Sequence, residues 1–200
     1  MRTLLSGARG EQLVKLARTA VERYVQESVI IEPEKGESPK SGVFVTLHYL
    51  KGREERLRGC IGFALPHKQL YQSVIDAAIA AATEDPRFLP VNSNELDHIT
   101  FEVSVLTEPE ELKPADYKKQ IRIGNDGLLL RCKHGSGLLL PQVPVELNWD
   151  LDEYLANICY KAGAPLDVLQ NPSSKLYSFH AVVFKELEPR GKVLRLRQYK

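Results

Sequence analysis

The sequence predicts an α+β fold, built from alternating strands and a few amphipathic helices. Residues 43–50, 56–63 and 99–106 alternate apolar and polar side chains, which is typical of half-buried strands. Residues 11–26 and 69–83 instead repeat apolar side chains at helical spacing. Because runs of strands are separated by helices and short loops, we expect helices packed outside a sheet.

The boundaries of several elements follow from local signals. Pro86 ends the helix over 69–83, and Asn148 or Asp150 can cap a helix that runs to about residue 162. Asn125-Asp126-Gly127 is a strong hairpin signal and predicts strands at 121–124 and 128–132. A final strand is expected over 177–185.

Two segments recur later in the chain and indicate an internal duplication. Gly62–Pro66 resembles Gly137–Pro141, and residues 99–106 resemble 176–183, at offsets of about 75 and 77 positions. The sequence therefore predicts a single domain over 1–200, with strand-strand-helix-strand halves at roughly 10–107 and 120–188 that share one curved mixed or antiparallel sheet. The duplication pairs Cys60 with Gly135. Chance similarity between two β-hairpins is the alternative explanation.

Composition disfavours several classes of function. Lys and Arg number 27 against 26 Asp and Glu, and the basic residues concentrate only in the tail over 190–200, which a solvated strand explains better than nucleic-acid binding. Three cysteines do not suggest a disulfide framework. The sequence shows no signal peptide or apolar run long enough to cross a bilayer, so we expect a cytoplasmic protein that does not bind membranes. The five histidines are scattered and no phosphate loop or dinucleotide motif is present, which predicts no metal and no cofactor.

The segment Leu57-Arg-Gly-Cys-Ile-Gly62 carries the most specific chemistry. Strand alternation places Arg58 and Cys60 on one face, and the neighbouring strand offers Thr46 and His48 to the same face. Glu102 of the third strand can join this polar surface. A bulge at Gly59 would break the alternation.

Two interpretations of Cys60 remain open from the residues alone. Arg58 can lower the pKa of the thiol, and His48 with Glu102 can complete a nucleophile with its base, which makes Cys60 a candidate catalytic residue. Alternatively, Cys60 is a small residue packed under a helix and Arg58 pairs with Glu102 or another acid. Arg87, just after the second helix, either binds an anion or neutralises the end of that helix.

The motifs also occur in a recognisable order. After Leu57–Gly62 come Asp85-Pro-Arg-Phe, Phe101–Leu106, Leu140-Pro-Gln-Val-Pro, Trp149-Asp and Lys161-Ala-Gly. This series resembles the AMMECR family, over residues 10 to 188. The resemblance implies an α+β fold and a shared cleft formed by residues 58–62 and 85–88, and it associates the chain with Memo-type and radical-SAM proteins.

We therefore expect an accessory binding module rather than an enzyme, with a cleft for a small anionic ligand or a protein partner. The alternative is a cysteine-dependent enzyme, or an accessory subunit that works with Memo-type and radical-SAM proteins. The predicted binding residues are Arg58, Gly59, Cys60, Ile61, Gly62, Asp85, Arg87 and Glu102.

Overall fold

The chain folds into nine strands with helices between them, as far as the structure describes it. The computed structural model describes residues 6–33, 39–52, 54–66, 68–113 and 116–196. The strands are β1 (Val43–Lys51), β2 (Glu54–Phe63), β3 (Ile99–Leu106), β4 (Glu110–Glu111), β5 (Gly127–Cys132), β6 (Gly135–Leu139), β7 (Lys175–Phe179), β8 (Ala181–Glu186) and β9 (Val193–Arg195). The helices are α1 (Gly7–Glu27), α2 (Leu70–Thr83), η1 (Ser93–His98), α3 (Tyr117–Gln120), α4 (Val143–Glu146), α5 (Leu151–Lys161) and η3 (Leu166–Gln170).

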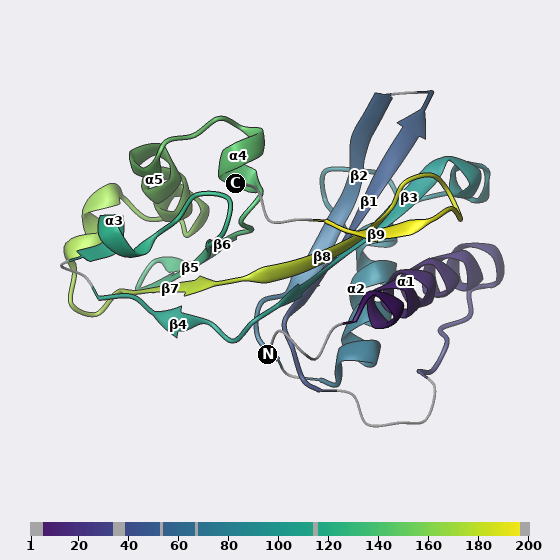
Figure 1. Cartoon of the computed structure of the whole chain (residues 1–200), viewed down its shortest axis with the longest axis horizontal. Coiled ribbons are helices and arrows are strands. Elements are labelled where there is room, and N and C mark those ends of the chain that lie inside the picture. The colour runs from purple at the N-terminus through teal and green to yellow at the C-terminus, as the bar shows by residue number, and fades with distance from the viewer. Residues whose placement is uncertain (1–5, 34–38, 53, 67, 114–115, 197–200) are drawn as a thin grey trace. The chain divides into compact units, whose positions relative to one another are not determined.

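These elements form two sheets in two compact units (Figure 1). The first sheet has the order β2-β1-β3-β8-β9 and the second the order β4-β7-β5-β6. The first unit holds the described residues before Thr107 and those from Val182 onward, and the second runs from Thr107 to Ala181. The α+β class is thus confirmed. Among the described helices, none is long and apolar enough to cross a membrane.

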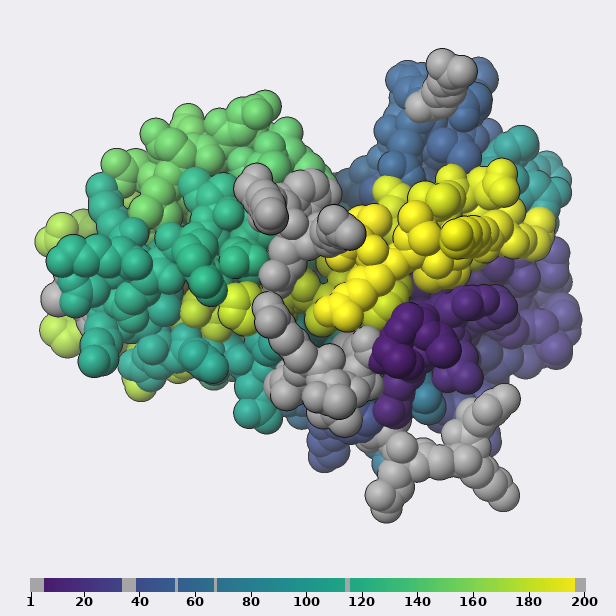
Figure 2. Space-filling view, viewed as in Figure 1, coloured from purple at the N-terminus to yellow at the C-terminus, as the bar shows by residue number. Residues whose placement is uncertain are grey.

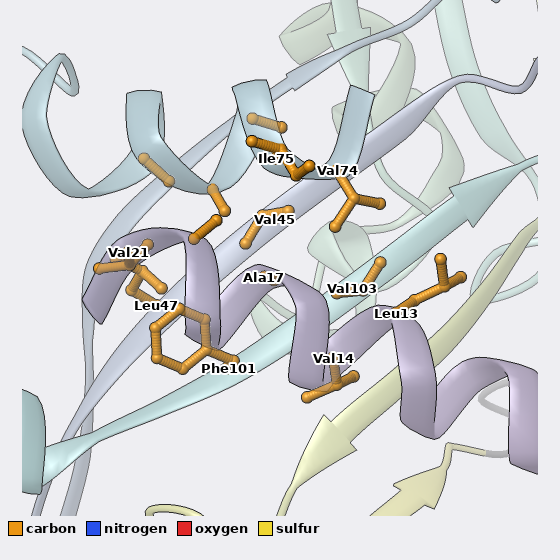
Figure 3. Close-up of a cluster of buried hydrophobic side chains, with 14 of the residues drawn as sticks. Leu13, Val14, Ala17, Val21, Val45, Leu47, Val74, Ile75, Phe101 and Val103 are labelled. Atoms are coloured by element: carbon orange, nitrogen blue, oxygen red, sulfur yellow. The ribbon is translucent and has the colours of Figure 1, made fainter. Parts of the chain in front are cut away.

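In the first unit, α1 and α2 pack side by side against one face of the sheet. Figure 3 shows Val14 and Ala17 of α1, Val74 of α2, Val45 of β1 and Phe101 of β3 in one cluster of buried side chains. All five side chains are fully buried. Figure 2 shows α1, in purple, beside the yellow C-terminal strands, and α1 contacts β9. Burial of this apolar face is the main stabilising term of the unit.

A buried ion pair joins three elements of the same unit. Arg18 of α1 donates to both carboxylate oxygens of Glu186 in β8, with an Nε–Oε1 distance of 2.8 Å. Glu186 also accepts the backbone N–H of Phe101, and Arg18 donates to the carbonyl of Ile99. Because both charges are almost fully buried, the pair depends on these additional hydrogen bonds.

The second unit has a smaller core between its sheet and α5. Asp150, one of the two caps that the sequence offered, caps α5 through a capping box with Glu153. The Tyr154 ring is fully buried and its hydroxyl donates to the carbonyl of Asp126 at 3.0 Å. Leu128 and Leu130 of β5 contribute to the same core.

Three expectations need correction. The strands form two sheets rather than one, because the predicted strand over 177–185 is interrupted at His180, with β7 in the second sheet and β8 in the first. Residues 121–124 form no strand; the side chain of Asp126 accepts the backbone N–H of Arg122 at 2.8 Å and closes a loop there. The hairpin instead joins β5 to β6 through residues 133–134.

The predicted duplication can be compared with the topology of the two units. Both units contain a strand-strand-helix-strand segment with the same strand order, β2-β1-β3 and β6-β5-β7. A Cβ on Gly59 would meet the carbonyl oxygen of Ala81 in α2, and a Cβ on Gly137 would meet backbone atoms at the end of α5. If these two helix contacts are equivalent, the counterpart of Cys60 is Leu138 rather than Gly135. A common origin of the halves stays a prediction.

Candidate functional site

Cys60 lies in a polar row that crosses three strands. Thr46 of β1 pairs with Cys60 of β2 on one side and with Glu102 of β3 on the other. The Thr46 hydroxyl donates to the Cys60 sulfur at 3.2 Å. Thr46 and Glu102 are buried and Cys60 is partly buried. Three of the five residues of the predicted polar surface, Thr46, Cys60 and Glu102, therefore lie side by side, two of them buried.

Arg58 leaves this surface because of a β-bulge. Leu47 pairs with Gly59 and His48 pairs with Leu57, which leaves Arg58 as the extra residue of β2. Its guanidinium donates to Glu95 in η1 through two bonds, 2.7 Å from Nε and 3.0 Å from Nη2. Arg58 therefore pairs with an acid other than Glu102, which is one of the pairings expected from the sequence. An arginine whose charge is already matched is also less available to an incoming anion.

Asp85 connects Cys60 to Arg87. Its carboxylate accepts the backbone N–H of Cys60 at 2.8 Å, the backbone N–H of Arg87 at 3.1 Å, and two bonds from the Arg87 guanidinium at 2.9 and 2.6 Å. Asp85 is 4% exposed. The hydrogen bond from Arg87 is the main reason that the pKa of Asp85 lies well below its usual range. The carboxylate therefore holds the loop after α2 against the edge of β2.

The remaining predicted residues have simpler positions. Gly59 lies against the last turn of α2, where a side chain would collide with the helix backbone. Ile61 packs against the core of the first unit, and Gly62 pairs with Phe44 of β1. These three residues shape the strand and present little chemistry of their own.

The electrostatics do not favour a reactive thiolate. Burial raises the pKa of the Cys60 thiol, and the hydrogen bond from Thr46 and the charge of Arg87 offset only part of this effect. The expectation that Arg58 lowers this pKa is therefore wrong, because the bulge directs that guanidinium to Glu95.

His48 lies between two acids rather than against the thiol. Its Nε2 atom is 3.9 Å from Glu102 and its Nδ1 atom is 4.0 Å from Glu55, which binds Lys185 at 2.7 Å. Burial, helped by Lys185, lowers the pKa of His48 to about 4, so the imidazole is neutral at pH 7. A neutral His can accept a proton, and both of its ring nitrogens lie within 4.0 Å of a carboxylate.

Comparison with known proteins establishes the family. The model of the AMMECR1 family matches residues 14–184. The chain belongs to the AMMECR1 family. Protein TK0174 of Thermococcus kodakarensis is 52% identical over 194 residues, which cover 93% of this chain and 94% of that protein. Protein MJ0810 of Methanocaldococcus jannaschii is 46% identical over 197 residues and 96% of each chain. The crystal structure of an uncharacterized protein from Pyrococcus horikoshii, PH0010, matches with a TM-score of 0.87 and 46% identity, over 94% of this chain and 96% of that one.

One feature of this AMMECR1 chain was missed by sequence reasoning. The loop that Asp85 holds in place carries Leu89, whose side chain is 85% exposed. Its neighbour Phe88 is half-buried, with the Cζ atoms of Arg58 and Arg87 at 5.8 and 5.5 Å from the ring centroid. The signal available in the sequence was an apolar residue beside Pro90 in a loop, which alone does not indicate exposure.

Metal binding finds no support in the described part of this AMMECR1 chain, where no group of three or more His, Cys, Asp or Glu side chains is arranged to hold an ion. His67 and the last four residues of the basic tail lie outside the described residues. Arg190, where the tail begins, pairs with Glu22 and Asp97.

Proposed function

We propose that this AMMECR1-family chain is an accessory binding module that docks a partner protein through the loop Pro86–Pro90. The observation that carries the proposal is the combination of an exposed leucine with a fixed backbone. Leu89 is 85% exposed, whereas the loop is held at one end by Asp85 and at the other by the bond from the Val91 N–H to the Ala82 carbonyl at 2.8 Å. A pre-ordered apolar anchor loses little conformational entropy on binding.

The neighbours of Leu89 are of the kind that protein interfaces use. Aromatic and arginine side chains are enriched among the residues that dominate binding energy, and Phe88 and Arg87 flank Leu89 directly. Arg87 keeps 53% of its side chain exposed although Asp85 binds it. These contacts support a macromolecular partner over a free small anion, since Glu95 and Asp85 already neutralise both arginines of the site.

The contacts around Cys60 give less support to a cysteine-dependent enzyme. A nucleophilic thiol needs a lowered pKa or an adjacent base, and here the pKa of Cys60 is raised while the ring nitrogens of His48 lie 3.9 and 4.0 Å from Glu102 and Glu55. The resemblance to the family offers Memo-type and radical-SAM proteins as the first partners to test.

Site-specific photo-crosslinking tests the proposal. A benzoylphenylalanine placed at position 89 should crosslink one defined protein in cells of the source organism. The same group at position 187, where Leu187 is 54% exposed in the same unit, is the matched control. Asp85→Asn should weaken the crosslink at position 89, because the loop loses its anchor. Equal crosslinking at both positions, or none at position 89, would refute the docking role.

A further inference from the structure

Two of the three cysteines meet in the core of the second unit, one from the sheet and one from a helix. Cys132 ends β5 and shares a strand face with Leu128 and Leu130, which belong to the core between the sheet and α5. Cys159 lies in α5 and is 1% exposed within the same core. Cys132 packs against this cluster of side chains. The two thiols therefore approach each other across the contact between strand and helix.

Glycines in β6 let the backbone of α5 lie directly on the hairpin that carries Cys132. Gly135 pairs with Cys132, and a Cβ on Gly135 would lie 3.0 Å from the Ala162 carbonyl oxygen. A Cβ on Gly137 would lie 2.8 Å from the Ala162 nitrogen. Ala162 follows the last turn of α5, and its N–H donates to the Cys159 carbonyl at 3.0 Å. Because helix and hairpin approach so closely here, the span that a disulfide must bridge is short.

The electrostatics of Cys159 also indicate that Cys132 is close. Burial is the main reason that the pKa of the Cys159 thiol rises to about 11, and the charge of a Cys132 thiolate contributes to the rise. The repulsion between two thiolates weakens with distance, so this contribution requires the two sulfur atoms to be near each other. The Cys132 thiol donates to the Gly135 carbonyl at 3.5 Å, which directs its sulfur toward β6, the strand that α5 contacts through its glycines.

We propose that Cys132 and Cys159 form an intramolecular disulfide when the protein meets a low-molecular-weight disulfide such as oxidised glutathione. The partly buried Cys132 is the more accessible of the two, and its thiolate attacks one sulfur of oxidised glutathione. The S–S bond breaks, and one glutathione leaves as its thiolate. The Cys159 thiolate then attacks the Cys132 sulfur of the mixed disulfide and releases the second glutathione. Two protein thiols are thereby oxidised, one glutathione disulfide is reduced, and α5 is tied to β5. This redox site lies in the second unit and does not depend on the docking loop of the first.

Oxidation of the native protein with glutathione disulfide, followed by peptide mapping under non-reducing conditions, tests the bridge. We expect one cross-linked pair of peptides, which contain Cys132 and Cys159, and a melting temperature about 5 °C or more above that of the reduced protein. Cys159→Ala should retain one glutathione on Cys132, because the thiol that displaces it is gone. Cys132→Ala should leave Cys159 free, because Cys159 is buried.

The control is the same oxidation in denaturing urea, where the three cysteines should pair in mixed combinations. Four results with the native protein would overturn the assignment: glutathione retained on Cys132, a bridge that includes Cys60, a bridge between two chains, or a free Cys159 beside an oxidised Cys132. A lower melting temperature of the bridged protein would overturn it too, since the native fold would then not accommodate the bridge.

Discussion

The strand-strand-helix-strand segments of the two units have the same strand order. They differ in the row of paired residues next to the glycine that contacts the helix, which is Gly59 in the first unit and Gly137 in the second. In the first unit this row is Cys60, Thr46 and Glu102, and in the second it is Leu138, Leu129 and Tyr177. The same arrangement of strands therefore also forms with an apolar row at this position. The difference teaches that this arrangement of strands does not by itself require a polar row.

The glycines themselves should be indispensable, and their substitution should give the largest effect. A Cβ on Gly59 would lie 2.1 Å from the Ala81 carbonyl oxygen, whereas one on Gly137 would lie 2.8 Å from the nearest backbone atom. We expect Gly59→Ala to cost about 3 kcal/mol of unfolding free energy and Gly137→Ala about 1–2 kcal/mol, as overpacking does. Urea unfolding of both variants measures this, and a neutral Gly59→Ala would break the proposed equivalence of the two contacts.

The pH dependence of the unfolding free energy should reflect the titration of His48, which belongs to the first unit. Its pKa is about 4 in the folded state and 6.5 in the unfolded chain, so between these values the unfolded state binds more protons. Stability should therefore fall by about 2–3 kcal/mol as pH drops from 6.5 to 4. His48→Gln should flatten this part of the profile, measured by chemical unfolding at several pH values. An unchanged slope in the variant would show that other groups cause it.

Local signals allowed prediction of α1, α2, α5 and β3, whereas contacts distant in sequence decided the site. Pro86 and the candidate cap Asp150 marked helix ends correctly. Arg58 was misplaced because the bulge depends on pairing with β1, and its true partner Glu95 lies 37 positions away. The exposure of Leu89 likewise follows from the anchoring of Asp85 to Cys60, which no periodic pattern reveals.

The order in which the three cysteines react should not be the one suggested by the segment Leu57–Gly62 alone, which makes Cys60 the reactive thiol. Burial raises the pKa of both Cys60 and Cys159, the latter to about 11, and Cys159 is fully buried. We expect Cys132, which is partly buried at the end of β5, to be alkylated first and Cys159 last. Mass spectrometry after brief alkylation of the native protein gives the order. Fastest modification of Cys60 would revive the nucleophile hypothesis.

The smallest effect is expected from Cys60→Ser. A serine hydroxyl can accept the bond from Thr46 that the sulfur now accepts, so the unfolding free energy should change by less than about 1 kcal/mol. Thermal and urea unfolding check this value. A loss of several kcal/mol would make Cys60 a core residue and remove the contrast with the second unit.

The central claim is that the first unit carries a docking loop whose exposed residue serves binding and not stability. The most direct measurement compares Leu89→Ser with Leu187→Ser, for both unfolding free energy and affinity toward the partner captured by crosslinking. Both variants should unfold within about 0.5 kcal/mol of the wild type, since both leucines are largely exposed. Only Leu89→Ser should lose affinity, by at least about tenfold. Wild-type affinity in Leu89→Ser, or marked destabilisation by that substitution, would contradict the claim.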